Sequence, residues 1–155
     1  MTVEWDERYW YPEDGGIVWL AGYSLVDRAT GAYLGRDAPE LAAAGLRVAG
    51  VAGAARHHAD ALASDAAAPG RALVLRRDPG NVHDPNAIGV AIADGALLGY
   101  VPRELAAELA PQLDAGRPWA AAVLREQRAS PRDPRIGVTM LLAAAASIDF
   151  REPGV

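Results

Sequence analysis

The 155-residue sequence contains no cysteine. This absence excludes a disulfide scaffold, an iron–sulfur cluster, a thiolate zinc site and a cysteine nucleophile. No apolar run approaches the roughly 18–20 residues that a membrane-spanning helix needs. Residues 1–13 also lack the basic and apolar regions of a secretory signal. We therefore expect a cytoplasmic protein that makes no contact with a membrane.

Lysine is absent as well, and all 15 basic residues are arginine. Together with the high alanine content, this is typical of proteins from high-GC bacterial genomes. Any phosphate contact must then come from arginine, whose planar guanidinium suits phosphate geometry. The phosphate-binding loop of many nucleotide hydrolases requires a lysine, so this sequence cannot form that loop and gives little support to nucleotide hydrolysis.

Recognisable catalytic patterns are missing too. The sequence holds three histidines and no His-Glu-x-x-His or His-x-x-x-His spacing. A metal site from His57, His58 and Asp60 is conceivable, but adjacent residues on a helix point about 100° apart and rarely share a metal. No serine lies in a Gly-x-Ser-x-Gly setting. We expect no catalytic residues, no metal and no cofactor.

The net charge of −5 lies in the first third of the chain. Residues 1–45 hold three basic and eight acidic side chains, whereas residues 46–155 hold twelve of each. This excludes a globally basic nucleic-acid binder but permits a local basic groove. The acidic segment also carries Trp5, Tyr9, Trp10 and Tyr11. It would suit either a contact with a protein partner or a lid over such a groove.

Hydrophobic periodicity and turn residues predict short strands with a few helices. The clearest hairpin signal is Asp94-Gly95 between two apolar runs. The clearest helix covers 102–113, with leucines every four residues at 105, 109 and 113. Residues 1–13 are expected to be a loose lead-in, and Asp37 is expected to cap a short helix. The expected strands are 17–26, 32–34, 46–51, 72–75, 87–92, 97–101, 119–125 and 136–142, and the expected helices are 39–44, 56–64 and 102–113.

These elements predict an α+β fold that is mainly β. We expect a small OB- or SH3-like β-barrel with two or three short helices. The expected organisation is an acidic N-terminal extension over 1–45 with a hairpin and a short helix, a barrel domain over 46–142, and a C-terminal tail over 143–155.

Two motifs carry the functional information. Residues 76–90 read Arg-Arg-Asp-Pro-Gly-Asn-Val-His-Asp-Pro-Asn-Ala-Ile-Gly-Val, and residues 99–106 read Gly-Tyr-Val-Pro-Arg-Glu-Leu-Ala. At this spacing the pair resembles the HIRAN domain family over roughly residues 46–142. That family comprises barrel modules attached to helicase-like DNA-repair ATPases and small free-standing bacterial proteins. The ATPase activity belongs to the fused helicases.

The resemblance implies a module that binds single-stranded DNA in repair or replication, with recognition of a free 3′ end. By position in the motif, Asp84 would accept a hydrogen bond from the 3′-hydroxyl. Asn81 would bond to sugar or base edges, and Arg103 would hold a phosphate. Tyr100 matches an aromatic or imidazole position, and Arg77 and His83 are supporting candidates. A helicase or repair protein is the implied protein partner.

Elementary chemistry agrees with this assignment. Arg103 opens a predicted helix, where free N–H groups and the helix dipole favour an anion. The Asp84 carboxylate repels phosphate, so beside a phosphate site it suits a neutral donor such as a hydroxyl. An internal nucleotide of DNA has no 3′-hydroxyl, so the pairing favours a strand terminus.

The sequence departs from the family pattern at one place. Ala52-Gly53 stands where paired aromatic residues are expected. A base–aromatic stack is worth ~1–3 kcal/mol, so its loss would weaken binding by about one to two orders of magnitude. Tyr100 and His83, or His57 and His58, are the rings that could replace it. The alternative function is a protein-interaction module with a degenerate ligand site, and the sequence does not separate DNA from RNA.

Overall fold

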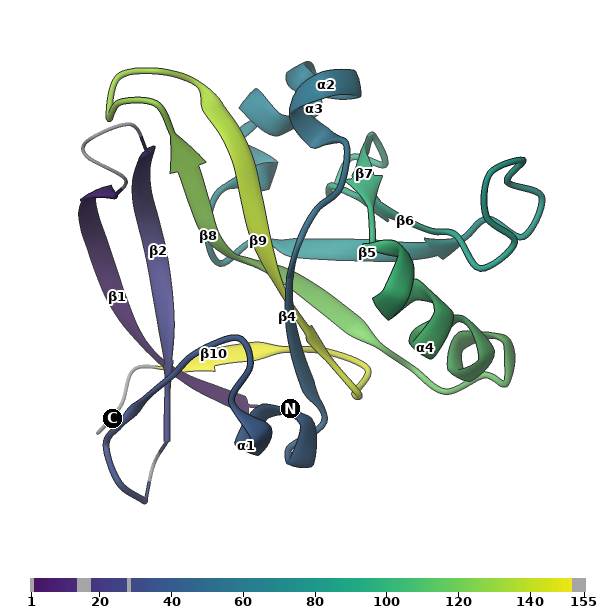
Figure 1. Cartoon of the computed structure of the whole chain (residues 1–155), viewed down its shortest axis with the longest axis horizontal. Coiled ribbons are helices and arrows are strands. Elements are labelled where there is room, and N and C mark those ends of the chain that lie inside the picture. The colour runs from purple at the N-terminus through teal and green to yellow at the C-terminus, as the bar shows by residue number, and fades with distance from the viewer. Residues whose placement is uncertain (1, 14–17, 28, 152–155) are drawn as a thin grey trace.

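The computed structural model describes residues 2–13, 18–27 and 29–151. Within these ranges the chain forms ten strands, four short α-helices and one 3₁₀ turn (Figure 1). The strands are β1 (Thr2–Glu13), β2 (Val18–Val26), β3 (Tyr33–Leu34), β4 (Leu46–Gly50), β5 (Ala72–Arg77), β6 (Ile88–Ala91), β7 (Leu97–Tyr100), β8 (Ala120–Arg128), β9 (Arg135–Ala143) and β10 (Asp149–Arg151). The helices are α1 (Pro39–Ala43), α2 (Ala54–His57), α3 (Ala59–Ala63), η1 (Asp65–Ala67) and α4 (Arg103–Asp114).

Six strands pair in the order β4-β9-β8-β5-β6-β7, and every pair is antiparallel. The chain directly after β4 meets the far end of this row. There Ala52 N–H donates to the Tyr100 carbonyl at 2.8 Å, and Tyr100 N–H donates to the Ala52 carbonyl at 3.0 Å. This single bridge joins the first and last strands. The predicted mainly β fold with few short helices is confirmed, while the finer OB- or SH3-like assignment stays a prediction.

Gly99 makes the bridge possible. A Cβ at this position would lie under 3.0 Å from both the Ala52 carbonyl oxygen and Val51 Cγ1. No side chain fits in that space, so only glycine lets β7 approach the chain after β4 this closely. The family-like Gly-Tyr corner at 99–100 is therefore a requirement of strand pairing.

The main core lies inside this row of strands. Leu98, Val123 and Leu142 are fully buried in it, together with the inward face of α4. Leu109 of α4 is also fully buried, which confirms the predicted apolar stripe of this helix. Since α4 is anchored by its buried face, its N-terminus is held at a fixed place beside the loop that follows β5 (Figure 1).

The N-terminal strands continue the same sheet. β8 pairs with β5 at residues 121–122 and with β2 at residues 125–128. β1 and β3 then flank β2, and β10 runs parallel to β1. The hairpin predicted for residues 17–26 and 32–34 is confirmed over Val18–Val26 and Tyr33–Leu34, and residue 17 lies outside the described residues. The predicted loose lead-in is wrong, because Thr2–Glu13 is a strand that pairs along β2.

Three details of the helices and strands differ from expectation. Ala38, without a side-chain cap, precedes α1, so Asp37 is not its cap. The expected helix at 56–64 is divided into α2 and α3, because His58 has φ −137° and ψ 43°. The division lets α2 bury Ala54 while α3 buries Leu62. Strands β5 and β8 also extend further than predicted, to residues 77 and 128.

In the part of the chain that the structure describes, no helix combines the length and the apolar character needed to cross a bilayer.

Candidate nucleic-acid interface

The loop between β5 and β6 is organised by Asn81. Its Oδ1 accepts hydrogen bonds from the N–H groups of His83 at 2.9 Å and Asp84 at 3.1 Å. Its Nδ2 donates to Asp78 Oδ2 at 3.1 Å. An asparagine side chain that bonds backbone groups two and three residues ahead is a common way to close a loop. Asn81 therefore fixes the place of Asp84.

Asp84 uses one carboxylate oxygen for the loop and keeps the other open. Oδ1 accepts from Asn86 N–H at 2.9 Å. Oδ2 lies 4.0 Å from Arg103 Nε, beyond hydrogen-bond distance, and accepts no hydrogen bond from any described residue. The side chain is only 17% exposed. Oδ2 is thus a fixed acceptor that faces a cation and is available to a neutral donor.

Arg103 is the opposite case, with a side chain that is 77% exposed. It is the first residue of α4, where the backbone N–H groups have no partners within the helix. Its Nη2 reaches the His83 carbonyl at 3.4 Å, a weak contact that a stronger acceptor can replace. The guanidinium and the helix N-terminus thus place positive charge directly beside Asp84.

Arg77 is occupied by the protein. Nε and Nη2 bind Asp114 in α4 at 2.9 and 3.2 Å, and Nη1 and Nη2 bind the carbonyls of Ala87 at 2.8 Å and Pro85 at 3.1 Å. The hydrogen bonds to Asp114 raise the pKa of Arg77 and lower the pKa of Asp114. This group, which we call the Arg77–Asp114 clamp, ties the loop to α4. The structure thus gives Arg77 a positioning role rather than an open donor.

The rings near the site are Tyr100 and His83. His83 is exposed on the loop, and Tyr100 is half-buried at the end of β7. Tyr100 forms a hydrogen-bonded antiparallel pair with Ala52, so their side chains lie on the same face. The small, exposed Ala52 therefore leaves the neighbouring Tyr100 ring without an aromatic cover.

Val82 is a residue that the sequence reasoning missed. It lies between Asn81 and His83 and is 91% exposed, the largest value among the exposed large hydrophobic side chains that the structure describes. An apolar residue in an otherwise polar loop was the available signal. It offers an exposed apolar contact two residues before Asp84 in the loop.

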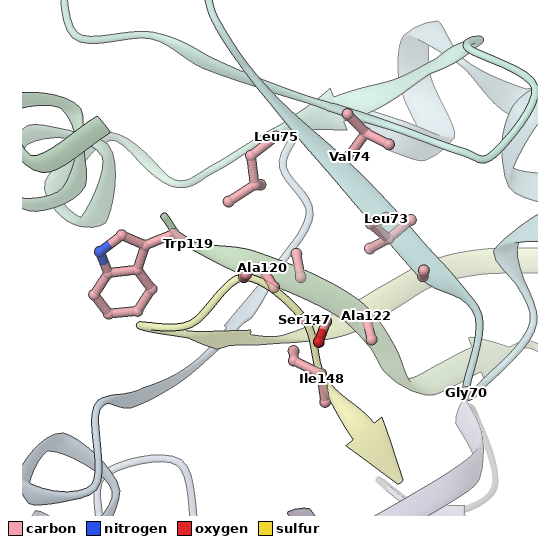
Figure 2. Close-up of a pocket in the computed structure, with 12 residues that line it drawn as sticks. Gly70, Leu73, Val74, Leu75, Trp119, Ala120, Ala122, Ser147 and Ile148 are labelled. Carbon is pink, nitrogen blue, oxygen red and sulfur yellow. The ribbon is translucent and has the colours of Figure 1, made fainter. Parts of the chain in front are cut away.

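A separate pocket of about 320 Å³ lies where β5 and β8 splay apart (Figure 2). Figure 2 shows Leu75, Trp119 and Ile148 around it. No titratable side chain lines it, so it offers a phosphate no charged partner. Across the described ranges, no group of three or more His, Asp or Glu residues is placed to hold a metal ion.

Comparisons with known proteins give a consistent result. A protein-family model described as HIRAN domain matches residues 46–143. A Fanconi-associated nuclease 1 homolog from Oryza sativa subsp. japonica is 52% identical over 48 residues, which are 29% of this chain and 5% of that protein. The chain therefore corresponds to a small part of that relative.

Two solved structures are also similar. The crystal structure of the HIRAN domain of human HLTF is 24% identical, covers 63% of this chain and 74% of that chain, and gives a TM-score of 0.47. A crystal structure of a protein from Lactobacillus plantarum is 23% identical, covers 62% of this chain and 91% of that chain, and gives a TM-score of 0.42.

Proposed function

Because the chain belongs to the HIRAN domain family, we propose that it is a nucleic-acid-binding module that recognises single-stranded DNA at a free 3′ end. The observation that carries this proposal is the open Asp84 Oδ2, held 4.0 Å from Arg103 at the start of α4. An acceptor and an anion site side by side match a terminal hydroxyl and the phosphate that precedes it. The site is one of binding, and we assign it no catalytic residue.

In this proposal the 3′-hydroxyl donates its hydrogen to Asp84 Oδ2. A hydrogen bond to a charged acceptor contributes about 1.5–3 kcal/mol. Arg103 and the first N–H groups of α4 bind the adjacent phosphate. Asn81 and Arg77 hold the loop and α4 in register, and Tyr100 and His83 offer ring faces to the last base.

Asp84 also supplies selectivity. A 3′-phosphate would place a second anion against the carboxylate. Two like charges about 4 Å apart repel by about 1 kcal/mol in water and by about 4 kcal/mol near a protein surface. We therefore expect a strand with a 3′-phosphate to bind at least fivefold more weakly than one with a 3′-hydroxyl.

The test is fluorescence anisotropy with labelled strands of about ten nucleotides that end in either group, at low and moderate salt because phosphate contacts depend on salt. Asp84→Asn removes the charge and keeps the size, so it should weaken binding to the hydroxyl and remove the discrimination. Asp37→Asn is the matched control, since Asp37 is exposed and lies outside the site. Equal binding of both ends by the wild-type protein would refute 3′-end recognition.

We further propose that residues 46–142 carry this function, flanked by residues 1–45 and 143–155. A helicase or repair protein is the proposed protein partner. Failure of every strand to bind at low salt would favour the alternative, a protein-interaction module with a degenerate ligand site.

A further inference from the structure

A second pocket, lined by polar side chains, lies between the α2–α3 segment and the start of β7. Its volume is about 500 Å³, and the residues that define its chemistry are Arg56, His57, His58, Asp60, Ala96 and Leu97. Figure 1 shows α2 and α3 beside β7, and both helices contact that strand. We call it the α2–β7 pocket. No residue of the Asp84–Arg103 site lines it.

The lining combines rings with charges of both signs. The rings of His57 and His58 lie 6.3 Å apart at 65° to each other. Arg56 and Asp60 are both exposed at the rim and have opposite charges, while Leu97 is half-buried. Arg56 would attract a phosphate, whereas Asp60 would repel it. A nucleobase suits the set better, because it offers a π-face to a ring together with hydrogen-bond donors and acceptors at its edge.

The pocket is connected to the Asp84–Arg103 site by short stretches of chain. β7 runs from Leu97 at the pocket to Tyr100 at the site, a distance of about 10 Å at the usual rise of a strand. His57 also lies over Gly53, because a Cβ there would be 3.7 Å from His57 Cδ2. The pocket therefore begins next to Gly53, one residue from the bridge between Ala52 and Tyr100.

We propose that the α2–β7 pocket holds one unstacked nucleobase of a bound strand, on the 5′ side of the terminal nucleotide. This inference rests on the proposed function and extends it. The imidazoles of His57 and His58 supply the stacking surface. Arg56 donates to carbonyl or ring-nitrogen acceptors of the base, and Asp60 accepts from an exocyclic amino group. The pocket thus adds a second set of rings to those of Tyr100 and His83.

The experiment is a scan with abasic nucleotides. Labelled strands of ten nucleotides with a free 3′-hydroxyl carry one abasic residue at each position in turn, and their affinities are measured by anisotropy. The terminal position reports on the Asp84–Arg103 site. We expect one further position, on its 5′ side, at which loss of the base weakens wild-type binding by about five- to a hundredfold, the range of one base–aromatic stack.

Variants assign that position to the pocket. His57→Ala should bind the intact strand more weakly and lose the internal abasic effect, while His57→Phe should retain it because a ring remains. Arg36→Ala is the control for an exposed arginine away from the pocket, and it should leave the scan unchanged. Thermal unfolding of each variant confirms that it is folded.

The outcomes separate the two proposals. If strands bind but the internal scan is flat, or the internal effect is equally large in His57→Ala, the pocket proposal is refuted and 3′-end binding stands. If no strand binds at low salt, both are refuted. An internal effect that disappears in His57→Ala and persists in His57→Phe supports the pocket.

Discussion

Replacement of Arg77 by alanine distinguishes a positioning residue from a phosphate contact. The change removes the hydrogen bond from Arg77 Nη1 to the Ala87 carbonyl. Because the donor is charged, this bond contributes about 1.5–3 kcal/mol. The bonds to Pro85 and Asp114 are exposed, and Asp114 is 56% exposed, so solvent screening leaves them a small contribution to stability. We therefore expect a loss of about 1.5–3 kcal/mol in the free energy of unfolding, mainly from the bond to the Ala87 carbonyl.

The assay has two readouts. For a chain of this length, such a loss lowers the melting temperature by on the order of 5–10 °C. The same variant should bind single-stranded DNA more weakly because the loop and α4 lose their register. The slope of log affinity against log salt should not change, since each phosphate contact contributes about 0.7 to that slope for a single strand. Arg103→Ala should instead change the salt slope and leave the stability unchanged. We expect a slope smaller by about 0.7 and a free energy of unfolding within about 0.5 kcal/mol of wild type.

The reasoning would be refuted by one clear pattern. If Arg77→Ala reduced the salt slope as much as Arg103→Ala and left the melting temperature unchanged, Arg77 would be a phosphate contact. The Arg77–Asp114 clamp would then have no positioning role.

Three further predictions concern strand closure, acid stability and the missing rings. Gly99→Ala forces β7 away from Ala52, and we expect a loss of more than 2 kcal/mol in the free energy of unfolding, measured with urea; a loss under 0.5 kcal/mol would show that the bridge is dispensable. The lowered pKa of Asp114 means that the clamp contributes fully above the unfolded value of about 3.9 and is lost as pH falls through the folded pKa. Between pH 6 and pH 3 the melting temperature of the wild type should therefore fall further than that of Asp114→Ala. Parallel curves of melting temperature against pH would contradict this. Ala52→Tyr places a ring on the face of Tyr100, and we expect tighter DNA binding by about five- to a hundredfold; unchanged affinity would mean that the terminal base does not lie there.

The sequence predicted the elements whose signals are local. Asp94-Gly95 between apolar runs and the four-residue leucine spacing of α4 need no distant partner to be recognised, and the structure confirms both. β10 was missed because its pairing partner, β1, lies at the other end of the chain. β1 was missed although β2 follows it directly, because its acidic side chains interrupt any apolar run. The division at His58 was also hidden, since alanine-rich sequence favours a continuous helix and tertiary packing of Leu62 decides otherwise.

The site residues show the same contrast between local signals and long-range contacts. Motif spacing brought Asp84 and Arg103 together correctly in space, because the hairpin and α4 have predictable lengths. The function of Arg77 could not be read from the motif, since its partner Asp114 lies at the far end of α4. An arginine next to a loop signals phosphate binding only if no carboxylate already holds it.

The closing bridge explains why the two proposed binding places occur where they do. Ala52 and Tyr100 are the only residues by which the chain after β4 pairs with β7 in the described structure. The bridge brings the start of α2 to one end of β7, while Pro102 turns the chain into α4 at the same end. The loop of residues 78–87 therefore lies beside Arg103, and the α2–α3 segment lies beside β7. Besides the ring faces of Tyr100 and His83, the rings of the α2–α3 segment are then a second surface on which this chain can hold a base.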